Sequence, residues 1–379
     1  MARASSDLLR QIRHRPGMYV GDTGGYGLHR LPLLLLQAGA LAASEGRGDE
    51  VSLHFEADGS CSFSFNGPLW PSRLVAESPG DSLASLFTLA DVDLRAPRPD
   101  GAPETFLLVS PYEDLAIVNA LASELEVSLG SGGRLWRQSF RRGEPAGPVH
   151  EDLVTEGAPP SSRGTRIHFV PDPSIFERPR LSVLGLSWRM EELAALHERV
   201  SFRLRDDVRQ LETHHHFERG LVDYTARLSA SALPLHAPWS FEGRHGSTQV
   251  RLSLQWCGTP GSRAVSWVNQ LRASGGTHLK GLVEGLHGAL HHYAETVGRM
   301  PEISAYIPSV LMEGLTVLLD VTVARPVWLG PVKGELANEE CAFDVASLVE
   351  TWLGKRFGEE SVVAERILDH VIARYIARG

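Results

Sequence analysis

Residues 15–43 read RPGMYVGDTGGYGLHRLPLLLLQAGALAA, and this stretch decides how the rest of the chain is interpreted. Its second part, Leu31 to Ala43, is the most apolar run in the sequence. It is shorter than the roughly 20 residues that a membrane-spanning helix needs, so we expect a buried helix and no membrane segment. The residues before Arg15 alternate apolar with charged side chains, which argues against a signal peptide.

Outward from this helix, an α+β pattern extends through the chain. Two alternating segments, VSLHFEA and CSFSFN, flank Asp58-Gly59 and predict a β-hairpin. A helix is expected over Asp114 to Leu125, followed by strands of an antiparallel sheet in EVSL, RLWRQSF and TRIHFVPD. Later segments predict helices over Leu181 to Val200, over Leu279 to Val297 and from Cys341 onward, with strands in VRLSLQW and LTVLLDVTVARP between them.

Composition limits the class of protein. With 379 residues, 42% of them hydrophobic, the chain is long enough for two cores, and a change of character at His214 to Gly220 predicts the boundary between them. The net charge of -9 argues against nucleic-acid binding by the whole surface, although it leaves room for a local basic patch. The three cysteines have no CxxC spacing, so we expect neither disulfides nor a zinc ribbon, and a cytoplasmic location.

Further motifs recur in a definite order along the chain: FNG (65–67), IVNALAS (117–123), WRQSFRRGEP (136–145), RGTRIHFVPDPSIF (163–176), HFERGLVDY (216–224), GGTHLKG (275–281) and EGLTVLLDV (313–321). Together with RPGMYVGDT and GLHRL, they resemble the ATPase region of the DNA gyrase B subunit and its topoisomerase IV counterpart. The resemblance implies a Bergerat-fold α/β sandwich over residues 1–215. A transducer domain with a ribosomal-protein-S5-like fold is implied over residues 216–379. Because the chain ends where that transducer would end, we expect no DNA-cleavage domain.

The resemblance also assigns catalytic positions. The family's general-base glutamate falls at Leu34, its magnesium-holding asparagine at Ala38, and the acid between them at Gln37. ATP hydrolysis needs a carboxylate that orients water, and leucine has none. Glu45 lies about 16 Å further along a helix, which is too far to replace it. We therefore expect no catalytic residue and no metal ligand in this helix.

The adenine-binding and phosphate-binding positions are also altered. The family's adenine-binding aspartate corresponds to Phe65, which has no carboxylate to accept the purine amino group. The arginine that follows the glycine of that motif is Pro68. The segment SPYED (110–114) replaces the glycine-rich phosphate loop, and its acids are interpreted as helix-capping residues. The upstream loop, residues 95–104, holds three prolines without N–H groups and offers no substitute.

Several family positions remain as candidate nucleotide contacts. Thr165 matches the threonine that backs the adenine site, and Lys333 matches the transducer lysine that reaches the terminal phosphate. An ordinary strand-end threonine and an ordinary loop lysine are the alternatives. The full candidate set is Asn66, Gly67, Arg137, Gly164, Thr165 and Lys333. ATP and Mg²⁺ are the implied cofactors, but the substitutions predict that neither is used.

Two other residue groups invite attention. The run His214, His215, His216 has consecutive side chains on opposite faces of an extended segment, so a metal site is not expected. Five tryptophans in apolar patterns are predicted to be core residues: Trp136, Trp188, Trp256, Trp267 and Trp328.

The leading hypothesis is a stand-alone, catalytically degenerate relative that serves as a scaffold or regulator. The alternatives are an ATP-hydrolysing topoisomerase subunit with a rearranged site, and a pocket for another small molecule that stacks on Phe65.

The partners we expect are a second copy of the chain or a topoisomerase subunit. With a first helix expected from Leu8, little chain remains for a dimerisation arm. Self-association would then use the transducer or the tail over residues 359–378. The tail has an apolar stripe that could instead pack on its own domain: Val362, Val363, Ile367, Val371 and Ile372.

Overall fold

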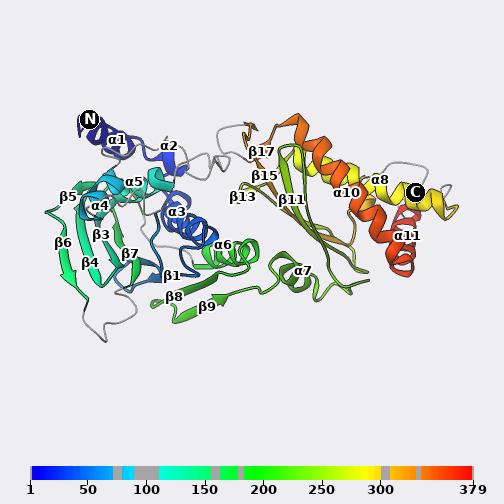
Figure 1. Ribbon diagram of the computed structural model, residues 1–379, viewed down its shortest axis with the longest axis horizontal. Helices are drawn as coiled ribbons and strands as arrows, with labels where there is room; N and C mark the ends of the chain where they lie inside the picture. The colour runs from blue at the N-terminus through cyan, green and yellow to red at the C-terminus, as the bar shows by residue number, and fades with distance from the viewer. Residues whose placement is uncertain are drawn as a thin grey trace. The chain divides into compact units, whose positions relative to one another are not determined.

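The computed structural model describes residues 2–70, 79–88, 111–154, 163–177, 183–299, 308–329 and 334–377. The described chain forms two compact units that meet in the sequence between Glu218 and Arg219 (Figure 1). Both units combine helices with sheets, so the predicted α+β class is confirmed. The domain limits 1–215 and 216–379 stay a prediction. No helix within these ranges is both long and apolar enough to cross a membrane.

The first unit is built on one mixed sheet with the strand order β5-β4-β3-β7-β2-β1-β8-β9, and β6 pairs with β4 at one edge. The strands are β1 (Glu50–Phe55), β2 (Cys61–Phe65), β3 (Ala122–Ser131), β4 (Arg134–Arg141), β5 (Glu144–Pro145), β6 (His150–Leu153), β7 (Gly164–Pro171), β8 (Ser201–Asp206) and β9 (Leu211–His215). The predicted hairpin is confirmed as β1–β2. The strands expected in EVSL, RLWRQSF and TRIHFVPD pair antiparallel, as predicted. The sheet as a whole is mixed, because β1 and β8 run parallel. A long connection through the other strands lets the chain return in the same direction.

Helices cover one face of this sheet: α1 (Ala2–His14), α2 (Gly17–Val20), α3 (Gly25–Ser44), α4 (Pro79–Thr88), α5 (Pro111–Leu121) and α6 (Val183–Leu196). The predicted buried helix is α3, which packs on β1 and β2. Its start is set by the Asp22 carboxylate, which accepts hydrogen bonds from the backbone N–H groups of Gly24 and Gly27 at 2.9 and 2.8 Å. A Cβ at Gly27 would lie 1.9 Å from the Asp22 carbonyl oxygen, so only glycine fits there.

The structure corrects two local expectations about helix limits. The helix predicted to run to Leu125 ends at Leu121, because Leu125, Val127 and Leu129 instead alternate into the core from β3. The first helix begins at Ala2 rather than Leu8.

The tryptophan prediction is only partly right. Trp136, Trp256 and Trp267 are buried and Trp328 is half-buried, but Trp188 on α6 is 67% exposed, so its assignment to the core is wrong. Leu186 and Met190 lie on the opposite face of α6 from Trp188 and are buried.

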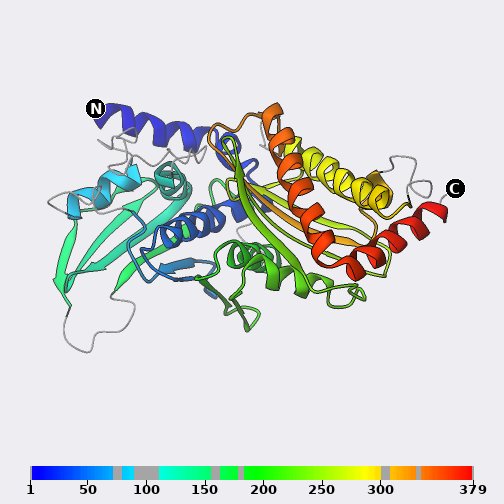
Figure 2. The ribbon, with the colours of Figure 1, turned by 45° about the vertical axis from the view of Figure 1, so that its right-hand side comes forward.

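The second unit has a sheet of order β10-β11-β15-β12-β13, in which β12 and β15 run parallel. These strands are β10 (Trp239–His245), β11 (Thr248–Trp256), β12 (Arg263–Val268), β13 (Leu271–Ala273) and β15 (Leu315–Val323). One face is covered by α8 (Thr277–Thr296), α10 (Glu339–Glu359) and α11 (Ser361–Ile376), as Figure 2 shows. The helix α7 (Leu221–Ser229) packs on β11, and Thr225 donates a hydrogen bond to Ser253.

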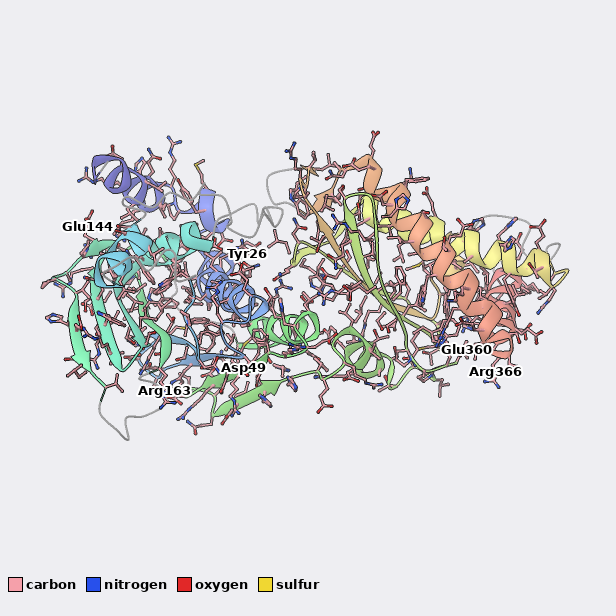
Figure 3. The ribbon with its side chains drawn as sticks, viewed as in Figure 1. Tyr26, Asp49, Glu144, Arg163, Glu360 and Arg366 are labelled. Carbon is pink, nitrogen blue, oxygen red and sulfur yellow. The ribbon has the colours of Figure 1, made fainter. Side chains whose placement is uncertain are left out.

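Three short strands and one helical turn complete this unit. The strands β14 (Gly275–Gly276), β17 (Glu335–Leu336) and β16 (Trp328–Leu329) form a small sheet in that order, and α9 spans Pro308–Leu311. Glu360, labelled in Figure 3, separates α10 from α11. The tail predicted from Cys341 onward is therefore two helices.

The apolar stripe of the tail packs on its own unit. Ile367, Val371 and Ile372 belong to the core shared with the sheet, and Val363 packs against that core while half-buried. Only Val362, which is 63% exposed, faces away from it. Of the two roles left open by the sequence, these contacts support packing within the domain.

Helices α8 and α10 approach each other closely because glycines line the contact. A Cβ at Gly281 would lie 2.3 Å from the Ala342 carbonyl oxygen, and a Cβ at Gly285 would lie 2.6 Å from that of Ala346. No side-chain movement relieves a clash with backbone, so any larger residue forces the helices apart.

His278, in the GGTHL motif, is fully buried at the start of α8. Its Nε2 lies 2.9 Å from the Ser266 hydroxyl oxygen. Burial lowers the pKa of His278 to about 4 from the ordinary value of 6.5. The ring is therefore neutral at pH 7, and the motif has a structural role in the core.

We expect Gly285→Ala to lower the free energy of unfolding by about 1–3 kcal/mol, because the added methyl overpacks the α8–α10 contact. Gly354→Ala is the matched control on α10, where an added Cβ meets no atom within 4 Å. It should stabilise the protein by about 0.5–1 kcal/mol through reduced backbone entropy. Urea unfolding measures both, and equal effects would contradict the close-contact explanation.

We also expect stability to fall as the pH is lowered from 6.5 towards 4. The unfolded state takes up protons in this range at His278 and at His236, whose pKa burial also lowers to about 4, and the folded state does not. Each of the two histidines therefore costs the native state at most about 3 kcal/mol. The pKa values of the Asp172 and Asp206 carboxylates are lowered below 3.8, so their contribution to stability is lost only under more acidic conditions. His278→Gln should reduce the pH dependence measured by urea unfolding and leave the part that comes from His236. Replacing the exposed His150 with Gln should leave it unchanged, and the opposite result would refute the assignment.

Candidate nucleotide site

The helix α3 carries apolar side chains at the positions assigned to the base and the metal ligand. Leu34 and Ala38 are four residues apart, so they share one face of the helix, and each is only 4% exposed. Gln37 is half-buried beside them, and α3 contains no acidic residue over its 20 residues. No group on this face can accept a proton from water or hold Mg²⁺ through a carboxylate.

Phe65, at the end of β2, is clamped between two backbone segments. A Cβ at Gly48 would lie 2.7 Å from its Cζ, and one at Gly67 would lie 3.2 Å from its Cε1. The side chain is 1% exposed, so no open ring face is left for a stacking ligand in this conformation. The ring fills space at the strand end that a smaller aspartate would leave open.

Asn66 joins the segment after α3 to the end of β2. Its Oδ1 accepts hydrogen bonds from the backbone N–H groups of Asp49 and Glu50 at 2.9 and 3.0 Å. Its Nδ2 donates to the Asp49 carboxylate at 2.6 Å. Asp49 is labelled in Figure 3, just before β1. Next to Asn66, a Cβ at Gly67 would lie 1.7 Å from the Arg47 carbonyl oxygen, so the two segments touch through backbone.

Thr165 and Gly164 hold the same strand end from β7. Thr165 lies opposite Phe65 in the β2–β7 register. Its buried hydroxyl donates to the Gly67 carbonyl oxygen at 3.0 Å and accepts from the Leu69 N–H at 3.2 Å. Gly164 has φ +75°, and a Cβ there would lie 2.2 Å from the Phe65 carbonyl oxygen. The single hydroxyl donor of Thr165 is therefore occupied, and only one acceptor lone pair remains.

Arg137 is not brought together with these residues. The sheet register pairs it with Ser128, whereas Thr165 pairs with the next residue, Leu129. Successive side chains of a strand point to opposite faces, so Arg137 and Thr165 lie on opposite faces of the sheet. The Arg137 guanidinium forms an ion pair with Asp152 of β6. A role for Arg137 in binding nucleotide stays a prediction.

Part of the assigned site lies outside the described residues. This applies to Lys333 and its neighbours Pro331 and Val332, which fall between β16 and β17 in the sequence, and to the loop 95–104. Within the SPYED segment, Asp114 is buried in the first turns of α5.

The histidine run has separate partners on separate faces. The Nε2 of His214 lies 2.6 Å from the Ser201 hydroxyl oxygen, and that of His215 lies 3.0 Å from the Ser187 hydroxyl oxygen. The Nδ1 of His216 faces a backbone carbonyl oxygen at 3.3 Å. Within the ranges that the structure describes, no group of three or more His, Cys, Asp or Glu residues is placed to hold a metal ion.

The structure adds two residues to this site that sequence reasoning missed. Gly48 makes room for the Phe65 ring, and Asp49 binds Asn66 through both its backbone and its side chain. Neither belongs to a motif, and the only signal was their place in a short polar segment between a helix and a strand.

This arrangement defines the class of protein: a helix-covered mixed sheet followed by a second α+β unit. A family profile described as DNA gyrase B matches residues 220–379. Among curated relatives, the mitochondrial DNA gyrase B subunit of Arabidopsis thaliana is 30% identical and aligns with 97% of this chain and 51% of its own length. The DNA gyrase B subunit of Clostridium acetobutylicum is 26% identical over 98% of this chain and 58% of its own length.

Two solved structures are similar to this chain as well, and both come from DNA gyrase B. The gyrase B protein from Myxococcus xanthus has a TM-score of 0.80 and 29% identity, covering 96% of this chain and 99% of that one. The 43K ATPase domain of Thermus thermophilus gyrase B, solved with an aminocoumarin, has a TM-score of 0.78 and 25% identity, covering 98% of this chain and 96% of that one.

The chain therefore resembles the ATPase-plus-transducer region of gyrase B over nearly its whole length, and the Bergerat-type sandwich followed by a transducer is confirmed. It spans about half the length of the curated relatives it matches.

We expect Thr165→Val to lower the free energy of unfolding by about 1–3 kcal/mol, because it leaves the buried Gly67 carbonyl and Leu69 N–H without their partner. Thr165→Ser is the matched control, since it keeps the hydroxyl and should retain most of the stability. Thermal or urea unfolding of the two variants measures the difference. Equal losses would show that the methyl packing, rather than the hydrogen bonds, matters.

Proposed function

We propose that this gyrase B-like region does not hydrolyse ATP and acts as a scaffold or regulator related to type II topoisomerases. The observation that carries the proposal is the buried apolar face of α3 with Leu34 and Ala38, the positions to which the resemblance assigns the base and the magnesium ligand. Hydrolysis in this class rests on positioning water with a carboxylate and neutralising phosphate charge with Mg²⁺, and this face supplies neither group.

The residues around Phe65 support the same proposal. Asn66, Gly67, Gly164 and Thr165 are engaged with the protein's own backbone or side chains, so their retention has a structural explanation without nucleotide. A bound purine would also meet a buried phenyl ring in place of a carboxylate. We also propose that no ATP-dependent step controls the protein.

The proposal extends to assembly. We propose a partner that is either a second copy of the chain or a topoisomerase subunit, held through a constitutive surface rather than one closed by ATP.

The alternative is an ATP-hydrolysing topoisomerase subunit with a divergent site. It is favoured by one observation, the resemblance to gyrase B across 97% of the chain. In this case Lys333 would still reach the terminal phosphate, and a base from outside α3 would orient the water.

We expect no single-turnover ATP hydrolysis above background by the purified protein with Mg²⁺. Leu34→Glu alone should also remain inactive, because it places a carboxylate in an apolar setting without the asparagine that holds magnesium. Burial there costs several kcal/mol or keeps the acid protonated. Hydrolysis by the wild type that disappears in Lys333→Ala would establish the alternative. Turnover gained in Leu34→Glu would show that the rest of the site is intact.

A further inference from the structure

A hollow of about 670 Å³ lies on the first unit at α1 and α2, on elements that do not contribute to the candidate nucleotide site. Its described wall includes three basic side chains, Arg10, His14 and Arg15, beside Met18 and Tyr19. We call it the α1–α2 pocket. In Figures 1 and 2, α1 begins at the label that marks the N-terminus, and α2 follows it. The helix α1 lies beside α4 and α5.

The helix that carries the pocket is fixed from its inner side. Leu9 and Ile12 are buried, and the Arg13 guanidinium donates to the Asp172 carboxylate and to the Ala120 carbonyl oxygen, each at 2.6 Å. Arg10 and His14 are four residues apart and therefore share the outer face. The pocket side chains thus project from a helix that is anchored by apolar packing and by an ion pair to the buried Asp172.

The wall of the pocket carries more basic than acidic side chains. Over the described ranges, the guanidinium groups of Arg10 and Arg15 have no hydrogen-bond or ion-pair partner, and Asp7 is the one acid among the described lining residues. Guanidinium groups bind phosphate through paired, charge-assisted hydrogen bonds. Met18 is 74% exposed and, with the half-buried Tyr19, gives the rim an apolar side.

We propose that the α1–α2 pocket binds an organic phosphate. The phosphoryl group lies against Arg10 and Arg15, and the apolar or aromatic part of the ligand lies against Met18 and Tyr19. A small ligand fits better than a nucleic-acid backbone, since the basic groups surround one hollow on a chain of net charge -9. The proposal is independent of whether ATP is hydrolysed at α3.

The test is calorimetric titration at low ionic strength with phenyl phosphate and with inorganic phosphate. Wild type should bind phenyl phosphate more tightly, and Arg10→Gln/Arg15→Gln should weaken binding of both probes at least about tenfold. Arg203→Gln/Arg205→Gln removes the same charge from β8, where both arginines have acidic partners, and should bind as wild type. Met18→Ser should weaken binding of phenyl phosphate and leave inorganic phosphate unchanged.

Three outcomes would overturn the proposal. In the first, wild type binds neither probe detectably. In the second, the Arg10→Gln/Arg15→Gln variant binds both probes with the affinity of wild type. In the third, duplex DNA binds in a way that depends on these arginines while phenyl phosphate does not bind. Thermal unfolding of each variant checks that it is folded, and the exposed position of the substituted side chains favours this.

Discussion

The packing of α3 on β1 and β2 is the contact on which the first unit depends. Leu31, Leu35 and Leu36 are fully buried in it. At Gly39 the helix comes so close to the sheet that an added Cβ would lie 3.0 Å from the Phe63 ring. Leu34 and Ala38 lie on another face of the same helix and are also buried. Apolar residues on both faces suit α3 to a buried position in the core.

The end of β2 is held together by polar contacts and by close approach of backbone segments. Asn66 and Thr165 use their polar atoms to join three segments that are distant in sequence, and Gly67 and Gly164 allow those segments to touch. Each of these residues has a structural reason to be present. Their presence alone therefore says little about nucleotide binding.

The second unit also depends on backbone segments that lie in close contact. Glycines let α8 lie against α10, and β14 pairs with β17 directly before α8 begins. A Cβ at Gly276, with φ +122°, would lie 2.3 Å from the Leu336 backbone nitrogen. The GGTHL motif is thus explained by backbone contact and by the burial of His278, without a catalytic role.

The sequence by itself determined the α+β class, the buried helix over Leu31 to Ala43 and the β1–β2 hairpin. These features follow from local patterns, namely apolar periodicity, turn residues and the identity of single side chains. Only the tertiary structure decided the parallel pairing of β1 with β8, the exposure of Trp188, the packing of the tail stripe on its own unit and the separation of Arg137 from Thr165. Each of these depends on which segments meet across long stretches of chain, and sheet register and helix packing fix that choice through contacts that no local pattern encodes.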